Sequence, residues 1–158
     1  VRDANGDIGS FGDLFNKAYD KDSPCFYAAQ GFRSQYAKSA WLKGEEVADI
    51  ANVVMLTKRD SGISSHIYQT DKPNPEGNET WNEDRVKQEL RSRGGSPFSS
   101  VSSVSVSADF GSGMVTSVTI SGDRGSETFN ATEFRNFFNL RAPANIQIVG
   151  PLFNVETK

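Results

Sequence analysis

The stretch that decides the predicted fold reads Val101-Ser-Ser-Val-Ser-Val-Ser-Ala-Asp-Phe-Gly-Ser-Gly-Met-Val-Thr-Ser-Val-Thr-Ile-Ser121. Apolar residues alternate with serine or threonine on both sides of a glycine-containing turn, and a second turn, Gly122-Asp-Arg-Gly125, follows. This alternation buries one face of a strand and leaves the other face in water. Short turns with glycine join consecutive antiparallel strands. We therefore expect an antiparallel β-meander.

The apolar period then changes from two to nearly four in Ala131-Thr-Glu-Phe-Arg-Asn-Phe-Phe-Asn-Leu140. This spacing predicts a helix over 131–140. Its apolar side chains are expected to close over the sheet: Phe134, Phe137, Phe138 and Leu140.

Polar residues mark both ends of this helix. Asn130 is expected to cap it, with Glu133 completing a capping box. Arg135 and Arg141 are expected to form salt bridges or to stack at the helix edge. After Pro143 a strand pattern returns over 145–149 and 152–155, and we expect its first part to add the last strand.

Two helices are predicted before the meander. The first runs from Glu45 to Arg59, with acids at its start and bases at its end, as the helix dipole favours. Its apolar stripe is expected to be the buried face, and its carboxylates, Glu45 and Asp49, are read as a solvated face. The stripe comprises Val47, Ile50, Ala51 and Val54, widened by Val53 and Leu56.

The other helix follows Thr80 and stops at Gly94-Gly95. Thr80 and Glu83 have capping-box spacing, and Asn82 is the alternative cap. Further upstream the pattern indicates a short helix over Phe11–Tyr19, a buried strand over Cys25–Ala29, and a polar loop or ragged edge strand over Gly31–Ser39.

These patterns predict a single α+β domain over residues 1–158. Residues 80–158 form the antiparallel β-meander packed against a phenylalanine-rich helix. Residues 1–79 are mostly helical and contribute to the two or three further helices of the N-terminal half. A chain of this length can bury a substantial core.

Bulk composition narrows the classes of function. The net charge of −3 argues against a nucleic-acid partner, which requires a basic face. No apolar run reaches the roughly 18 residues of a membrane span, so no transmembrane segment is expected. The single cysteine, Cys25, excludes an internal disulfide framework. Abundant Ser, Thr, Asn and Gly favour an extracytoplasmic location, and we expect Val1 to be a processed or cut end.

No residues in the chain predict a metal or a cofactor. Asp3-Ala-Asn-Gly-Asp7 is similar to a calcium loop, but its glycine comes fourth rather than sixth, which favours a plain turn. The only histidine, His66, has no partner at ligand spacing.

One run of residues in the later half resembles a known family. The run comprises Gly113-Met-Val-Thr-Ser-Val-Thr-Ile-Ser-Gly122, Gly125-Ser-Glu-Thr-Phe129, Ala131-Thr-Glu-Phe-Arg135 and Phe138-Asn-Leu140. It is similar to the later part of stage II sporulation protein D and the amidase-enhancer proteins. Upstream, Thr80-Trp81 and the helix reaching Leu90 also look similar. The resemblance covers about residues 80–155 and leaves 1–79 unmatched.

This resemblance implies a bacterial, sporulation-type protein that acts on peptidoglycan in the cell envelope. Members of the family cleave glycan strands or assist amidases, with a catalytic glutamate in a Pro-Ser-Glu-Met-Pro-like segment. Neither that segment nor the Gly-His-rich ending of the family is present here. The chain therefore looks like a non-catalytic internal or C-terminal piece, and no residue receives a catalytic role.

Three functions remain open at this point. The first is a non-catalytic portion that contributes to glycan-strand binding through aromatic faces that stack on sugar rings. Its expected partners are peptidoglycan glycan strands or a cell-wall hydrolase. The second is a free-standing enzyme that cleaves glycan strands with a carboxylate pair. The third is an extracellular structural or protein-interaction domain. The candidate sugar contacts are Trp41, Tyr68 and Trp81, and the candidate carboxylates are Glu45, Asp49, Asp123, Glu127 and Glu133.

Overall fold

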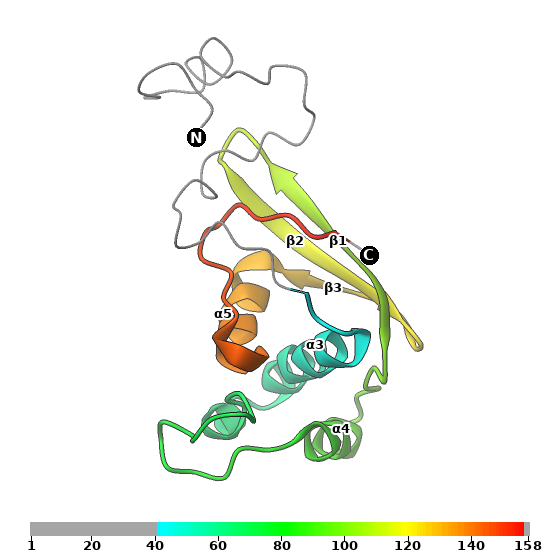
Figure 1. The fold of residues 1–158 in the computed structure, drawn as a ribbon. Helices are drawn as coiled ribbons and strands as arrows, with labels where there is room; N and C mark the ends of the chain where they lie inside the picture. Colours follow the sequence, from blue (N-terminus) through cyan, green and yellow to red (C-terminus); the bar gives the residue numbers. More distant parts are fainter. Residues whose placement is uncertain (1–40, 157–158) are drawn as a thin grey trace.

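The computed structural model describes residues 41–156 (Figure 1). The expected Asp3–Asp7 turn, Phe11–Tyr19 helix, Cys25–Ala29 strand and Gly31–Ser39 loop lie outside the described residues. In chain order the elements are α3 (Gly44–Arg59), a 3-10 helix η1 (Ser61–His66), α4 (Glu83–Ser92), β1 (Val101–Asp109), β2 (Met114–Gly122), β3 (Gly125–Asn130), α5 (Ala131–Arg141) and a 3-10 turn η2 (Pro143–Asn145).

The predicted meander is confirmed, and the fold is of the α+β class. The three strands form one antiparallel sheet in the order β1-β2-β3. Val118 lies opposite Phe129 and both are buried, whereas Thr119 lies opposite Thr128 on the other face. Because the strand period is two, one face of the sheet is apolar and the other carries hydroxyls. Helices α3 and α5 lie on one side of the sheet in Figure 1.

Two glycines make the β2–β3 end of the sheet possible. A Cβ atom on Gly122 would lie 2.2 Å from the backbone oxygen of Ser100. Only glycine therefore allows the end of β2 to approach the segment before β1 this closely. Gly125 has a φ of 104°, which L side chains rarely adopt.

Helix α3 is the centre of the described fold. It is buried at every position from Ala48 to Thr57. The expected apolar stripe was therefore too narrow, because α3 packs against α4, α5, η1 and the sheet, and so has neighbours on all sides. A helix surrounded in this way has no solvated face over most of its length.

Helix α5 buries fewer of its apolar side chains than the sequence predicts. Phe134 is 4% exposed and packs against the rings of Phe129 and Phe138, with centroids 5.9 and 6.0 Å away. Phe137 and Phe138 are only half-buried, and the prediction for Leu140 is wrong, since that residue is 37% exposed. Helix α5 contacts α3 as well as β2 and β3, so the sheet alone does not cover its apolar side chains.

The N-terminal caps are decided by single asparagines. Asn130 Oδ1 accepts from the backbone N–H groups of Thr132 (3.0 Å) and Glu133 (3.1 Å), which confirms the predicted cap. The expected capping box does not form, because the Glu133 carboxylate pairs with Lys58 Nζ at 3.0 Å. Asn82 caps α4 by accepting from Arg85 N at 2.9 Å. The alternative cap is therefore the one that forms, and the expected Thr80–Glu83 capping box does not: among residues 41–156 the buried Thr80 hydroxyl has no hydrogen-bond partner.

The predicted last strand is wrong. After η2, where Ala144 and Asn145 both have positive φ, residues 146–149 form neither strand nor helix. The Asn139 side chain forms hydrogen bonds with both backbone groups of Ile148: Ile148 N donates to Oδ1 (2.7 Å), and Nδ2 donates to Ile148 O (3.1 Å). These groups are therefore satisfied by an amide rather than by a neighbouring strand. The later tail is tied to β2 by a backbone hydrogen bond, in which Val115 N donates to Pro151 O at 2.8 Å.

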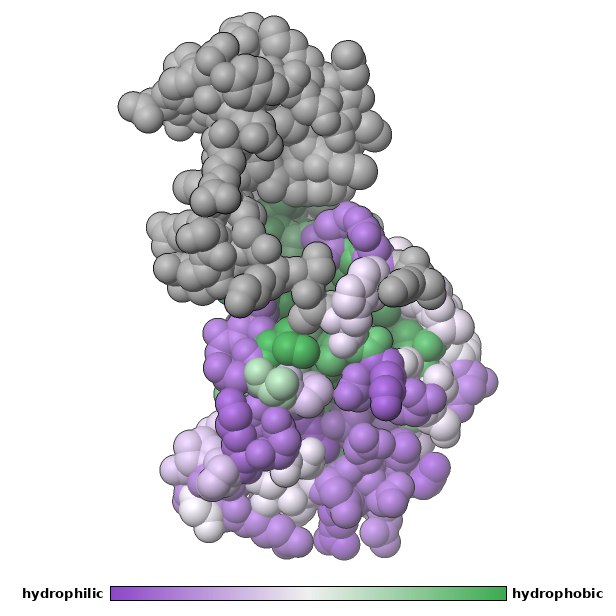
Figure 2. Space-filling view, viewed as in Figure 1, coloured by the Kyte–Doolittle hydropathy of each residue, from purple (hydrophilic) through white to green (hydrophobic). Residues whose placement is uncertain are grey.

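The surface divides into two zones in the view of Figure 2. Hydrophobic residues gather in a band across the middle, and hydrophilic residues cover the part below. None of the helices between residues 41 and 156 is both long enough and apolar enough to cross a membrane.

Candidate functional site

A buried ion pair positions two of the three aromatic candidates. Arg141 binds Asp49 through two hydrogen bonds, from Nε to Oδ2 (2.5 Å) and from Nη2 to Oδ1 (3.0 Å). Its Nη1 also donates to the backbone oxygens of Tyr68 (2.9 Å) and Trp81 (2.8 Å). The salt bridge expected for Arg141 is therefore confirmed, but it is buried rather than at the helix edge. The prediction that Asp49 lies on a solvated face is wrong, because Asp49 is buried.

The indole ring of Trp81 contacts two other side chains, His66 and Arg85. The His66 imidazole stacks on it with centroids 4.7 Å apart and an interplanar angle of 6°. The Arg85 guanidinium lies 5.6 Å from the ring centroid. His66 Nδ1 donates to the backbone oxygen of Glu79 at 2.7 Å, which fixes the ring orientation. His66 thus has a structural role here, and a role for Trp81 in sugar binding stays a prediction.

Tyr68 and Trp41 are placed differently. The Tyr68 hydroxyl donates to Glu76 Oε1 at 2.7 Å, and this hydrogen bond to a carboxylate raises the pKa of Tyr68 above its usual value. Trp41 precedes α3 and is 57% exposed, the most accessible of the three candidates. The Arg141 hydrogen bonds bring Tyr68 and Trp81 to the same side of the fold, and no such bond includes Trp41.

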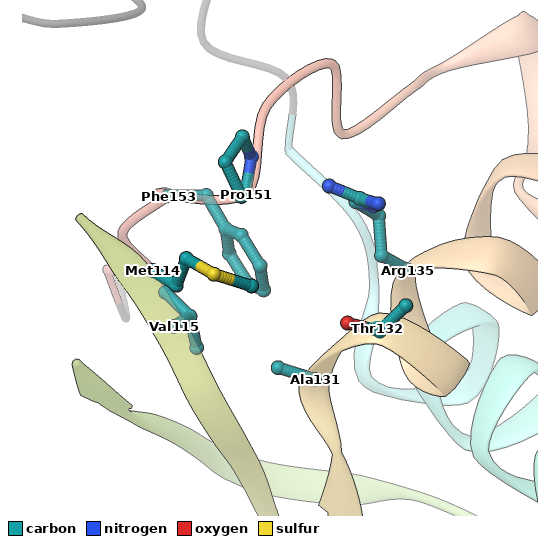
Figure 3. A pocket seen from close by; sticks show the side chains of 7 residues that line it. All are labelled: Met114, Val115, Ala131, Thr132, Arg135, Pro151 and Phe153. Carbon is teal, nitrogen blue, oxygen red and sulfur yellow. The ribbon is translucent and has the colours of Figure 1, made fainter. Parts of the chain in front are cut away.

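A hollow lies where α5 faces the start of β2 and the C-terminal tail (Figure 3). Thr132 and Arg135 project from α5, and opposite them stand side chains from β2 and the tail. The tail is held there by the Val115–Pro151 hydrogen bond. The lining residues are Met114, Val115, Ala131, Thr132, Arg135, Pro151 and Phe153.

Arg135 is the distinctive group of this hollow. It is half-buried, yet within residues 41–156 its guanidinium has no ion pair or hydrogen bond, contrary to the expected salt bridge at the helix edge. Removing a guanidinium partly from water without a partner is unfavourable. A guanidinium in this setting is suited to bind a carboxylate or another anionic group from a ligand.

The sequence contains one signal for this site. Arg135 belongs to the Phe134-Arg135 pair of the family-like run, but nothing in the spacing indicated that Thr132 and Arg135 would face Met114, Pro151 and Phe153. The tail residues lie about 20 positions away along the chain, and only the folded tail brings them to α5.

The five candidate carboxylates do not gather at one place. Asp49 is held by Arg141, Glu133 by Lys58 and Glu127 by Arg124. Asp123 accepts from Ser99 N and Ser100 N, and Glu45 lies in the first turn of α3. The described residues also contain no group of three or more His, Cys, Asp or Glu side chains that could hold a metal ion.

Comparison with known proteins found no matching family model, no matching curated protein and no matching solved structure. The candidate site therefore has to be judged on its own chemistry.

Proposed function

We propose that this chain is a non-catalytic portion of a bacterial cell-envelope protein that handles peptidoglycan, and that it contributes to glycan-strand binding. The observation that carries the proposal is the half-buried guanidinium of Arg135, which has no partner among residues 41–156 and lies at a shallow surface hollow lined by Thr132 and by apolar side chains. The family-like run that contains Arg135 gives independent support.

The chemistry of the hollow suits a peptidoglycan strand. Such a strand presents apolar sugar faces, hydroxyl and acetamido groups, and carboxylates on its lactyl and peptide substituents. The Phe153 ring and the Met114 side chain offer apolar contact, Thr132 offers a hydroxyl and Arg135 offers a cation. Trp41, the most exposed of the three aromatic candidates, lies outside the hollow.

Co-sedimentation with insoluble peptidoglycan tests the proposal. We expect the chain to be retained at low salt and Arg135→Gln to weaken retention by about tenfold, the effect of losing one charge-assisted hydrogen bond. Arg91→Gln is the matched control, because Arg91 is an exposed arginine on α4 and its loss changes the net charge equally.

Two results would contradict the proposal. One is the absence of retention at low salt. The other is equal loss of retention in Arg135→Gln and Arg91→Gln, which would mean that only net charge matters. Zymography on the same material tests the enzymatic alternative, and clearing that one of the five carboxylate substitutions abolishes would replace the proposal.

A further inference from the structure

The outer edge of β1 is an open strand edge. β1 pairs only with β2, and no other segment between Trp41 and Glu156 exchanges backbone hydrogen bonds with its other side. An exposed edge presents a row of backbone donors and acceptors that can pair with another strand. In Figure 1 β1 runs along the margin of the sheet, away from α5.

The two edges of the sheet differ in how they are protected. β3 carries Glu127 opposite Ile120, so an acidic residue stands on the apolar side of that edge, where it pairs with Arg124. Inward-pointing charges of this kind discourage pairing at an edge. From Val101 to Ala108, β1 has no charged residue and no proline. Its register is irregular at both ends, which leaves Ser103–Ser107 as a regular, unprotected segment.

The apolar side of β1 is also incompletely covered. The inward residues of β2 are buried, with Val118 and Ile120 at 0% exposure. The inward residues of β1 are only half-buried, including Val104 and Val106 at the middle of the strand. A strand added beside β1 would cover these two valines and satisfy the free backbone groups in one step.

The sequence of β1 complements itself about Ser105. In an antiparallel pair centred there, Ser103 lies opposite Ser107, Val104 opposite Val106, and Ser105 opposite its own copy. Over Ser103–Ser107 this register keeps the serines on the hydroxyl face and the valines on the apolar face, whereas a shift by one residue would mix them. An isologous two-fold interface requires this self-complementarity.

From these observations we propose that a second copy of this chain pairs with it through β1, antiparallel and centred on Ser105, to form a continuous six-stranded sheet. The hydroxyl face of each sheet already has rows across its strands, with Ser105, Thr119 and Thr128 in register. Across the two-fold axis these rows join, and the charge-free edge lets two identical strands approach without repulsion. The proposal is independent of the peptidoglycan role.

Disulfide trapping of the full 158-residue chain in a Cys25→Ser background tests both the dimer and its register. Ser105→Cys is expected to give a crosslinked dimer under mild oxidation, because facing Cβ atoms lie about 4.5–5.5 Å apart. Ser103→Cys alone should not crosslink, since each copy lies opposite position 107, but a mixture of Ser103→Cys and Ser107→Cys should. Equal crosslinking of Ser103→Cys and Ser105→Cys, or of neither, would overturn the proposal.

Sedimentation measures the association without crosslinks. The wild-type chain is expected to sediment as a species of twice 17.3 kDa. Ser105→Lys should weaken the dimer by up to about five-fold, because two like charges then face each other, and mixing it with Ser105→Glu should restore association. Ser126→Lys, on β3, is the control for added charge and should leave the dimer intact. A wild-type monomer at every concentration, or equal association of Ser105→Lys and Ser126→Lys, would refute the proposed dimer.

Discussion

The side-chain amide of Asn52 pairs with both backbone groups of Phe98. Phe98 N donates to Asn52 Oδ1 at 2.8 Å, and Asn52 Nδ2 donates to Phe98 O at 2.9 Å. Both residues are 0% exposed. The amide thus makes the two backbone hydrogen bonds that a neighbouring strand would otherwise make to Phe98. It also links the segment before β1 to the central helix α3.

Replacing Asn52 should therefore be costly. Asn52→Ala leaves a buried N–H and a buried C=O of Phe98 without partners, and each lost partner costs about 1–3 kcal/mol. We expect the free energy of unfolding to fall by about 3 kcal/mol in urea titrations. Asn136→Ala, at an exposed position of α5, should change it by less than about 0.5 kcal/mol. Similar effects of the two substitutions would show that the Asn52–Phe98 pairing has little energetic importance.

The Asp49–Arg141 pair should behave as a buried ion pair. Arg141→Met removes the partner of Asp49 and the donor to Tyr68 and Trp81, and breaking such a pair costs about 3–5 kcal/mol. Asp49→Leu combined with Arg141→Met should recover part of this loss, because no buried charge is then left alone. Urea titration of the single and double variants gives both values.

The same substitution should also act locally. Because Arg141 Nη1 holds the backbone oxygens of Tyr68 and Trp81, Arg141→Met should increase amide hydrogen exchange in the segment between η1 and α4 more than in the sheet. Uniform loss of protection throughout the chain would mean that Arg141 does not position this segment.

The cap of α5 offers a smaller, cleaner test. Asn130→Ala removes the acceptor for the Thr132 and Glu133 amides, and such caps are worth about 1 kcal/mol. Asn130→Ser keeps a capping oxygen and should retain most of the stability. Thermal unfolding of the three proteins distinguishes a capping role, which serine supports, from a packing role, which it does not.

Asp123 should give the protein a pH-dependent contribution to stability. Hydrogen bonds from the backbone N–H groups of Ser99, and then Ser100, hold the pKa of Asp123 below its usual value. A carboxylate with a lowered folded-state pKa stabilises the fold above its unfolded pKa of about 3.9, and this contribution is lost as the pH falls through the lower folded value. Comparing the free energies of unfolding of the wild type and Asp123→Asn isolates this pH-dependent contribution.

We expect Asp123→Asn to be less stable than the wild type at about pH 7, and the difference to shrink progressively as the pH falls below the unfolded pKa and through the lowered folded pKa of Asp123. Urea midpoints across this pH range measure the difference. A difference that stays constant across the range would show that the Asp123 charge has no part in holding Ser99 and Ser100.

The local elements of this protein could largely be predicted from the sequence. Alternating valines and serines predicted β1 and β2, apolar spacing predicted α3 and α5, and Asn130 was found as a cap because its role depends on residues two and three positions ahead. These features depend on side-chain periodicity and nearest neighbours along the chain.

The tertiary structure decided the features that depend on distant partners. Asp49 and Arg141 are 92 positions apart, so nothing local marks them as a buried pair, and α3 is buried on all sides only because several other elements surround it. Asn139 satisfies the backbone of Ile148 and so prevents the strand that the local pattern favours. The surroundings of Arg135 likewise exist only once the tail folds back beside β2. Among residues 41–156 the sequence by itself determined helices α3, α4 and α5 and the three-stranded meander, because periodicity is local. Long-range hydrogen bonds and packing decided which polar groups are buried and that the segment after η2 is not a strand.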